Sequence, residues 1–383
     1  MIGGGRHAFH HVPYNAHMSG IPDILVIGGG VIGLTTAYHL AGEGLRVTVV
    51  DQAGMGEQAS WAGAGILPDA DPDLAPTPFA RLKAQSVRMY PGLSAALRDE
   101  TGIDNGYRVC GGVELPEPGL RPRDLPTEEW HGPGAACEML SSWLFPELTG
   151  GFLGPHVFGT HLPGMAQVRN PWHLRALEAA CFSRGVTLLP GWPVRGFECD
   201  GGRVVAAVGD GGRIAAGAFL VSGGAWTGQL LAPLGVHLPI RPVRGQMLLL
   251  RFTPGRRHIV LRGKRYIVPR EDGMVLVGST EEEAGFDATT TEDALAGLRA
   301  FAREVNPHLG TAPMEKAWAG LRPASADGLP FLGAVPGFTN LHVAAGHFRA
   351  GLLLSPVTGV VMARLLAGRD PGAEMGPFAV GRA

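Results

Sequence analysis

Charge, cysteine and long apolar runs are all scarce in this sequence, and each shortage excludes a class of protein. Charged residues make up only 17% of the 383 residues and the net charge is -2, so neither nucleic acid nor an anionic membrane is an expected partner. The four cysteines form no C-x-x-C pair, which indicates neither a disulfide framework nor a metal site and favours a reducing, cytoplasmic setting. No stretch reaches the roughly 18 uninterrupted apolar residues of a transmembrane segment.

Apolar residues, glycine and proline are abundant instead. Hydrophobic residues form 45% of the chain, which also contains 59 glycines and 31 prolines. A chain of this length can bury the cores of about two or three domains. The glycines and prolines separate strand-like apolar runs, which indicates tight turns and close backbone approaches rather than disorder. Small molecules are the expected partners, and a homo-oligomer is compatible with this composition.

The first twenty residues, MIGGGRHAFHHVPYNAHMSG, show no periodic apolar pattern. They contain His7, His10, His11 and His17, so metal binding is one interpretation. The favoured interpretation is a disordered extension over residues 1–21, which takes no part in the fold.

The next stretch, DILVIGGGVIGLTTAYHLAGEGLRVTVVDQ, is typical of a βαβ unit. Its pattern predicts a strand over 24–27, a helix over 31–41 and a strand over 47–50. Gly28, Gly30 and Gly33 form G-x-G-x-x-G between the first strand and the helix. In this context the first glycine permits a tight turn, the second admits a pyrophosphate and the third lets helix and strand pack closely.

Asp51 ends the second strand, about 20 residues after the glycines, where an acidic side chain accepts hydrogen bonds from a ribose. An acid at this position disfavours a 2′-phosphate, so NADP is not expected. The glycines and Asp51 together do not distinguish NAD from FAD, and a purely structural glycine turn is the alternative.

Capped helices and hairpins follow. Asn170 and Pro171 predict the N-cap and first residue of a helix that stops at Gly185. Gly-Gly and Asp-Gly turns between residues 194 and 220 predict antiparallel hairpins. A last helix is expected to begin at Ser355-Pro356.

Further strands are expected where short apolar runs recur, in VTLL, AFLV, GQMLLLRF, RYIVPR, MVLVGST and LHVAAG. A helix is expected after Thr290 or Thr291. Residues 116–164 are rich in proline and glycine and give the weakest signal.

Arg322 stands in AWAGLRP, a run of small and apolar residues in which an unpaired charge is costly. The chain offers no carboxylate nearby before Asp327. The sequence around the arginine therefore does not supply its partner.

Several motifs taken together resemble the D-amino-acid oxidase superfamily of flavoproteins, and within it the glycine oxidases of thiamine biosynthesis are most similar. The resemblance extends from about Pro22 to Gly368. The motifs that carry it are VIGGGVIGLTTAYHLA, RPVRGQ, RYIVPR, WAGLRPASADGLPFLG and AAGHFRAGLLLSPVTG.

The resemblance implies an α/β fold, α+β overall, in which a Rossmann-like FAD-binding domain is interleaved with a mostly antiparallel β-sheet substrate domain. Cofactor-like segments at both ends of the chain and β-rich stretches between them favour the same interleaving. The predicted FAD-binding domain comprises residues 22–100, 165–240 and 315–370, the predicted substrate domain comprises 101–164 and 241–314, and 371–383 form a tail.

The resemblance also implies a site. Arg322 binds the carboxylate of a substrate that stacks over noncovalent FAD, Tyr266 donates a second hydrogen bond to it, and Arg349 lies in a loop between flavin and substrate. A carboxylate brought by the substrate would explain Arg322, because an arginine fork matches a carboxylate and does not deprotonate. The expected cofactor-binding residues are Gly28, Gly30, Val31, Ile32, Gly33, Asp51, Gln52, Ser60, Ala64, Gly65, Ile66, Val194, Gly224, Trp226, Arg322, His347, Phe348, Arg349, Ala350, Gly351 and Leu352.

The implied activity is oxidative deamination of glycine or another small amino acid or amine. Hydride passes to the flavin, the imine is released, and oxygen is the expected acceptor that gives hydrogen peroxide. Three alternatives stay open: a D-amino-acid dehydrogenase with a quinone acceptor, a sarcosine-oxidase-like enzyme, and a noncatalytic nucleotide-binding module.

Two positions depart from the family pattern. Lys264 and Arg265 stand where glycine oxidase has a histidine shortly before the tyrosine of YIVPR, and they are expected to add positive charge near the pocket mouth. Ile66 replaces a methionine near the flavin.

Overall fold

The computed structural model describes residues 20–117, 130–141, 144, 148, 149, 152, 153, 158–253 and 258–382. The N-terminal extension expected over residues 1–21, with its four histidines, lies outside these residues except for residues 20 and 21.

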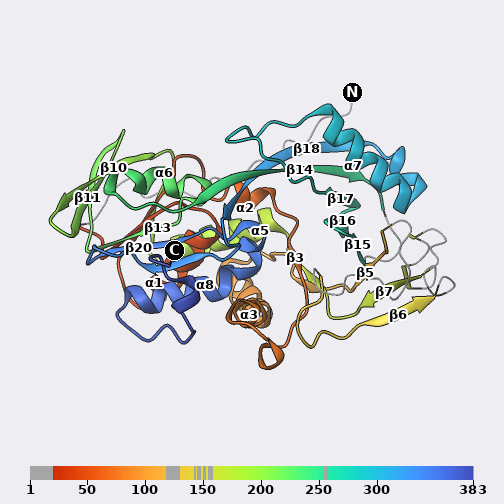
Figure 1. Ribbon diagram of the computed structural model, residues 1–383, viewed down its shortest axis with the longest axis horizontal. Helices are drawn as coiled ribbons and strands as arrows, with labels where there is room; N and C mark the ends of the chain where they lie inside the picture. Colours follow the sequence, from red (N-terminus) through yellow and green to blue (C-terminus); the bar gives the residue numbers. More distant parts are fainter. Residues whose placement is uncertain are drawn as a thin grey trace.

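A six-stranded sheet and an eight-stranded sheet stand side by side, and the long strands β14 and β18 run between the two regions (Figure 1). The six-stranded sheet has the order β19-β20-β13-β1-β2-β9 and is parallel except for β19 against β20. Its strands are β1 (Ile24–Ile27), β2 (Val47–Val50), β9 (Thr187–Leu189), β13 (Ala218–Val221), β19 (Phe331–Ala334) and β20 (Leu341–Ala345). This is the predicted Rossmann-like half of the fold.

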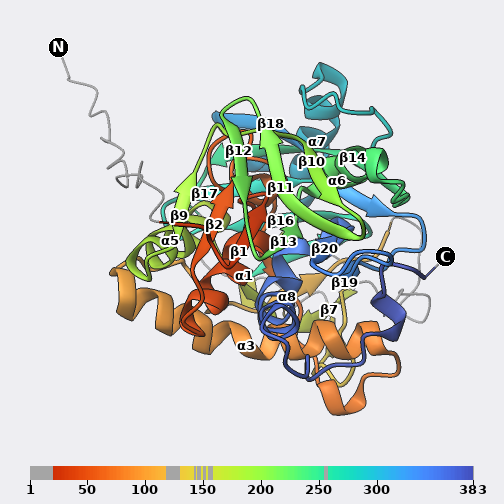
Figure 2. The ribbon, with the colours of Figure 1, turned by 90° about the vertical axis from the view of Figure 1, so that its left-hand side faces the viewer.

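Alternate residues of the buried strand β1 face two different layers. Ile24 and Val26 belong to the core shared with the helices, whereas Leu25 and Ile27 belong to the core on the opposite face. The helices are α1 (Val31–Gly42), α3 (Pro78–Thr101), α5 (Asn170–Ser183) and α8 (Gly351–Leu366). The opposite face is covered by the antiparallel strands β10 (Val194–Asp200), β11 (Arg203–Gly209) and β12 (Gly212–Ala215), as Figure 2 shows.

The longest helix, α3, has no counterpart among the sequence expectations. Thr77 caps it by accepting a hydrogen bond from Ala80 N at 3.1 Å, Pro78 occupies the first turn, and Gly102 ends it with a φ of 73°. These are ordinary start and stop signals. The helix lies across the base of the molecule and packs against α8 and α5 (Figure 2).

The eight-stranded sheet has the order β18-β14-β17-β16-β15-β5-β7-β6 and is antiparallel except for β15 against β5. Its strands are β5 (Gly112–Glu114), β6 (Glu138–Ser141), β7 (Phe158–Leu162), β14 (Ile240–Arg251), β15 (Ile259–Arg262), β16 (Arg265–Pro269), β17 (Met274–Gly278) and β18 (Met314–Ser325). The mixed α/β fold with a mostly antiparallel second sheet is thus confirmed. Residues 315–325, grouped above with the FAD-binding segments, pair with β14 in this sheet.

Helix α7 (Glu292–Val305) covers one face of the large sheet. Ile267 on β16 belongs to the core under α7 with Phe301, whereas its neighbour Tyr266 belongs to the core on the other face. The two-residue alternation of the strand therefore directs Tyr266 toward the six-stranded half of the molecule.

Short elements complete the described chain. They are α2 (Ala59–Ala62), α6 (Thr227–Leu231), the small sheet of β3 (Ile66–Leu67), β8 (Ala166–Gln167) and β4 (Arg108–Val109), and the 3₁₀ turns Pro72–Leu74, Gly224–Trp226, Ala232–Leu234, Pro307–Gly310, Phe348–Ala350 and Gly376–Phe378.

Two helix starts differ from expectation. Helix α8 begins at Gly351, not at Ser355-Pro356, because the proline is tolerated inside it: the carbonyl of Leu352, left without the Pro356 N–H, accepts hydrogen bonds from the hydroxyls of Tyr90 and Ser355. Asn170 is the first residue of α5 rather than its cap, and its side-chain amide donates to the Ser60 carbonyl at 2.8 Å.

Within the described residues, one helix, Phe348–Leu366, is apolar and long enough to meet the composition test for a membrane span. Half of it is buried inside the molecule against α1 and α3. A helix buried in the core of a protein is apolar too, so this composition is only weak evidence for a membrane span.

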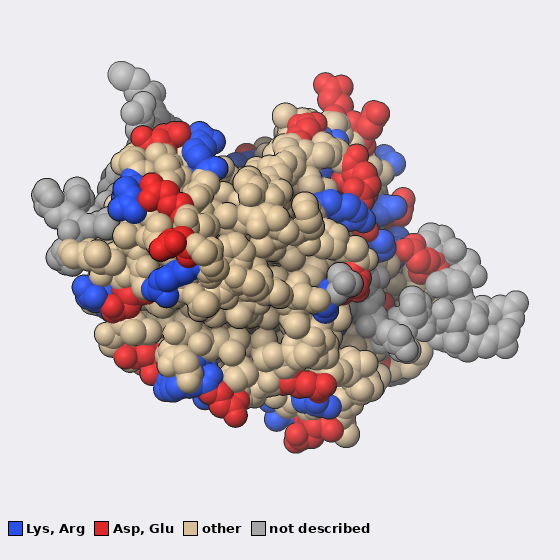
Figure 3. Space-filling view, turned by 60° about the vertical axis from the view of Figure 1, so that its left-hand side comes forward, with Lys and Arg blue, Asp and Glu red and all other residues tan. Residues whose placement is uncertain are grey.

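Charges of both signs are interspersed on the face shown in Figure 3, around an uncharged middle. Many surface charges pair with each other, as Arg195 does with Asp210 and Arg213 with Glu198 across the β10–β12 sheet.

Candidate functional site

One large cavity of about 660 Å³ lies where the two sheets meet. It is lined by the N-terminus of α1, the end of β2, residues 56–60 and 62–66, and parts of β14, β16 and β18. Residues 344, 345 and 347–353, from the end of β20 to the start of α8, complete the lining. Its volume lies within the range of cofactor and ligand sites.

The glycine turn forms the nucleotide end of this cavity. Gly28 has a φ of 110°, and a Cβ there would lie 2.4 Å from the carbonyl oxygen of Ser222, so only glycine fits. Gly28 and Gly30 line the cavity, but Gly33 does not. A Cβ on Gly33 would lie 1.9 Å from the Gly28 carbonyl oxygen, so Gly33 serves the close packing of helix and turn rather than direct contact with a ligand.

The α1 N-terminus is suited to phosphate. Gly30 offers no side-chain cap, and the hydroxyl of Ser60 accepts a hydrogen bond from Val31 N at 3.0 Å. Val31 and Ile32 also line the cavity. Helix N–H groups and the helix dipole stabilise an anion at such an end.

Asp51 is fixed at the end of β2. One carboxylate oxygen accepts from Gly29 N at 2.7 Å and the other from Ala53 N at 2.9 Å. Burial raises the pKa of Asp51, against the lowering effect of these hydrogen bonds. Each oxygen keeps acceptor capacity for a ribose hydroxyl.

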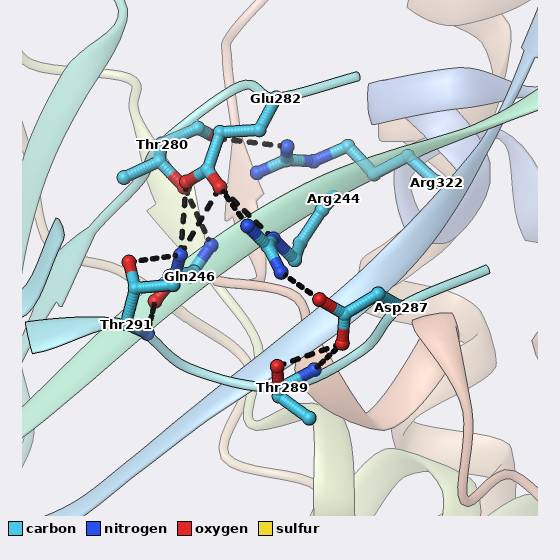
Figure 4. A network of polar contacts seen from close by, with 8 residues as sticks. All are labelled: Arg244, Gln246, Thr280, Glu282, Asp287, Thr289, Thr291 and Arg322. Atoms are coloured by element: carbon cyan, nitrogen blue, oxygen red, sulfur yellow. Dashed lines mark hydrogen bonds and ion pairs between the residues drawn. The ribbon is translucent and has the colours of Figure 1, made fainter. Parts of the chain in front are cut away.

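Arg322 lies at the opposite end of the cavity. Its Nη1 donates to the Thr280 carbonyl at 3.0 Å (Figure 4). Its Nη2 donates to the Ser279 hydroxyl at 2.7 Å. Neither partner is a carboxylate, so within the described part of the chain these bonds orient the guanidinium without neutralising it. Asp327, the nearest acid in sequence, instead accepts hydrogen bonds from Arg382, and these hold its pKa below the usual range.

Gly245 makes the position of Arg322 possible. A Cβ on Gly245 would lie 2.2 Å from both terminal nitrogens of the guanidinium. The guanidinium therefore rests on the bare backbone of β14 and faces the cavity, which both residues line.

Tyr266 also lines the cavity, and its side chain is buried. Its hydroxyl donates to the Met247 sulfur at 3.4 Å. A thioether is a weak acceptor, so a carboxylate in the cavity would be a much better partner for this hydroxyl.

Arg349 and Trp130 cover the cavity beside Tyr266. The Arg349 guanidinium lies 5.6 Å from the centre of the Trp130 ring, and that ring meets the Tyr266 ring edge-on at 6.1 Å. Arg349 also approaches Glu281, with 3.7 Å between Nη1 and Oε2. Trp130 and Tyr266 thus form an aromatic wall of the cavity at this point.

The positive charge expected from Lys264 and Arg265 is smaller than the sequence indicated. Lys264 pairs with Glu281 at 3.1 Å. Arg265 lies over the Phe301 ring of α7, on the far side of the sheet, because strand alternation turns it away from Tyr266.

The loop before α8 lies against the cavity. His347 is buried and hydrogen-bonds to the Thr358 hydroxyl at 3.3 Å, and burial lowers its pKa to about 3. Its imidazole is therefore neutral at neutral pH. Phe348, with a φ of 50°, adopts a left-handed conformation that is rare for an aromatic residue and is frequent at functional loops.

Nearly all the residues named from the sequence meet in this one cavity. Gly33 is the exception; those that line it are Gly28, Gly30, Val31, Ile32, Asp51, Gln52, Ser60, Ala64, Gly65, Ile66, Val194, Gly224, Trp226, Tyr266, Arg322, His347, Phe348, Arg349, Ala350, Gly351 and Leu352. Their individual contacts with a cofactor or substrate stay predictions.

Sequence reasoning missed several lining residues, including Lys83, Trp130, Gln229 and Gly245. Lys83 lies on α3, which was not foreseen, and Trp130 lies in the stretch with the weakest signal. Gly245 stands in the quoted motif RPVRGQ, where a glycine inside a strand is the signal for close approach of another group.

Arg270 was missed although it ends the motif RYIVPR. It is buried, and it donates to the side-chain oxygen of Gln167 and to the carbonyls of Val168 and Ala64, the last at 2.6 Å. Burial lowers its pKa to about 9. It ties the end of β16 to the segment 64–66, which lines the cavity.

The fold and the cavity define the class of protein as an oxidoreductase. A Rossmann-like nucleotide site adjoins a pocket in which an arginine is suited to bind a carboxylate. The glycine turn, the N-terminus of α1 and Asp51 fit the pyrophosphate and ribose of a dinucleotide. The chain belongs to the DAO family of FAD-dependent oxidoreductases, whose family model, described as FAD dependent oxidoreductase, matches residues 23–365. FAD is therefore its cofactor.

Individual relatives align with this chain over more than nine tenths of both sequences. A glycine oxidase of Pseudomonas aeruginosa is 38% identical, over 93% of this chain and 98% of that protein. The crystal structure of glycine oxidase from Geobacillus kaustophilus is 32% identical and superposes with a TM-score of 0.88, over 94% of this chain and 99% of that one. An iminodiacetate oxidase from Chelativorans is 28% identical with a TM-score of 0.81, over 93% and 98%.

Proposed function

We propose that this protein is a glycine oxidase that serves thiamine thiazole synthesis, oxidising glycine or a similarly small amino acid to its imine with release of hydrogen peroxide. The observation that carries the proposal is Arg322: a guanidinium at the end of the cofactor cavity, oriented by a carbonyl and a hydroxyl. Such an arginine is matched to a carboxylate that enters with the substrate.

The chain's own residues bind and orient. Arg322 holds the substrate carboxylate, and the Tyr266 hydroxyl exchanges its weak sulfur acceptor for the same carboxylate. Trp130 and Arg349 close the pocket over it. Bound FAD supplies the acceptor for two electrons and a proton.

No side-chain base is needed for this reaction. The two acids among the described lining residues, Asp51 and Glu57, both accept hydrogen bonds from backbone N–H groups at the nucleotide end. The two histidines among the described lining residues are also engaged, His347 with the Thr358 hydroxyl at 3.3 Å and His131 with Glu114 at 2.7 Å. The substrate amine therefore enters in its neutral form, and catalysis depends on positioning.

The test is peroxide release from the FAD-loaded protein with glycine, sarcosine, iminodiacetate and D- and L-amino acids. We expect glycine to be oxidised, and Arg322→Met to raise its KM by a factor equivalent to about 2 to 5 kcal/mol, because the carboxylate loses its charged partner. An unchanged KM in that variant would refute the carboxylate site. Reoxidation of the reduced protein by a quinone but not by oxygen would favour the dehydrogenase, and flavin retained after acid precipitation would favour a covalent, sarcosine-oxidase-like enzyme.

A further inference from the structure

A cluster of ion pairs around the buried Arg244 lies next to the groups that hold Arg322, and the proposed reaction does not use it. Arg244 on β14 has a side chain only 9% exposed. Its Nε and Nη2 donate to Glu282 Oε2 at 2.9 and 2.6 Å, and its Nη1 donates to Asp287 Oδ2 at 2.6 Å (Figure 4). A buried cation needs a charged partner. One carboxylate would be enough to balance the charge of Arg244, so burial alone does not explain why two carboxylates contact it.

The cluster fixes residues 279–282 against β14. Arg244 and Glu282 exchange backbone hydrogen bonds at 2.9 and 3.0 Å, and Gln246 N donates to the Thr280 hydroxyl at 2.9 Å. The Gln246 side chain donates to Glu282 at 3.0 Å. This segment carries the Ser279 hydroxyl and the Thr280 carbonyl, the two groups that orient Arg322.

The cluster also supplies hydrogen-bond donors to the Glu282 carboxylate. Burial acts to raise the pKa of Glu282, but hydrogen bonds from Thr280, Arg244 and Gln246 outweigh it and lower the pKa, so the carboxylate is ionised. In Figure 4 this carboxylate points to Arg244 and Gln246, while the Arg322 guanidinium is hydrogen-bonded at Thr280 in the same segment. Without Arg244, Glu282 would keep no cationic partner among the described residues, in the same segment as the two groups that orient Arg322.

We propose that Arg244 is a positioning residue for substrate binding: it holds Glu282 and Asp287 so that residues 279–282 orient Arg322 and Glu282 cannot pair with Arg322. The inference rests on the proposed function, because it takes Arg322 as the group that binds the substrate carboxylate. It predicts that Glu282, once released, competes with the substrate for the same guanidinium.

The experiment compares FAD-loaded wild type with Arg244→Met and with Arg244→Met combined with Glu282→Gln. For Arg244→Met we expect the KM for glycine, and the Kd for acetate measured from the flavin absorption spectrum, to rise about tenfold or more, with kcat within about twofold. In the double variant most of this loss should be recovered, because the competing charge is gone. If Arg244 served stability alone, the added Glu282→Gln change would remove further contacts and would not restore the KM.

Arg241→Met is the matched control. Arg241 lies on the same strand and pairs with Glu283, but both side chains are more than half exposed, so its variant should keep the wild-type KM. Arg244→Lys, which keeps the charge but loses the fork, should give an intermediate KM, and it replaces the methionine variant if that fails to load FAD.

Equal KM values for Arg244→Met and wild type, or a double variant no better than the single one, would overturn the proposal. If wild type neither oxidises glycine nor binds acetate, the proposed function fails instead. The positioning role is then decided by a crystal structure of Arg244→Met, in which Glu282 within hydrogen-bond distance of Arg322 supports it and an unmoved Glu282 refutes it.

Discussion

At the scale of single residues, Gly245 decides where the Arg322 guanidinium can lie. An added methyl group would stand 2.2 Å from both of its terminal nitrogens. Because these atoms end a flexible side chain, Gly245→Ala should displace Arg322 rather than unfold the sheet. We expect the KM for glycine to rise about 10- to 100-fold, which equals about 1.4 to 2.8 kcal/mol, with little change in thermal stability.

Gly196→Ala is a suitable control, because Gly196 also lies in a strand, β10, and an added Cβ there meets open space. Steady-state kinetics and thermal unfolding of both variants check the prediction. A Gly245→Ala enzyme with wild-type KM would mean that the position of Arg322 does not limit binding.

Residues with a strong local signature could be predicted from the sequence. Gly28 and Asp51 follow from the strand–turn–helix pattern, and Arg322 from its apolar surroundings together with the motif resemblance. The positions of Gly245 and Arg244 relative to Arg322 could not be predicted. They depend on the register between β14 and β18, in which Val243 lies opposite Arg322, and tertiary packing fixes this register.

At the scale of elements, Arg270 joins the end of β16 to the segment 64–66. Its guanidinium has three acceptors and is buried, so Arg270→Met should leave these acceptors without a charged donor. We expect the FAD dissociation constant to rise about tenfold or more, because the cavity-lining segment 64–66 loses an anchor.

Flavin fluorescence during titration of the apoprotein measures this constant. Arg251→Met offers a comparison, because Arg251 ends β14 in an exposed ion pair with Glu315. Equal FAD affinity in Arg270→Met and wild type would show that the segment 64–66 is held by its other contacts.

Elements were predictable where their signal was local. The βαβ unit and the hairpins of β10–β12 appeared as expected, because strand runs and glycine turns specify them. Helix α3 was missed despite its cap and stop residues, and α8 begins four residues before Ser355 because Tyr90, a residue of α3, compensates for Pro356. The proline inside this helix is compensated in part locally, by the Ser355 hydroxyl, and in part by Tyr90, a contact distant in sequence.

At the scale of the whole molecule, buried neutral histidines link stability to pH. His173 and His347 are buried, and burial lowers their pKa values to about 4 and about 3. In the unfolded chain a histidine titrates near 6.5, so between pH 6.5 and the folded values the unfolded chain binds more protons. Stability is therefore complete above pH 6.5 and falls as the pH is lowered, by about 2 kcal/mol for each histidine near pH 5.

His173 is the better site for a test, because it lies outside the cavity-lining set and its Nε2 has no hydrogen-bond partner among the described residues. His173→Gln removes the titrating group and keeps a side chain able to bond to Asn105, which contacts His173 Nδ1 at 3.1 Å. Urea unfolding at about pH 7 and about pH 5 should then show a smaller loss of stability in the variant than in wild type, by up to about 2 kcal/mol. Identical losses would mean that His173 is protonated in the folded protein through local opening, and that the acid sensitivity of the molecule arises at other groups.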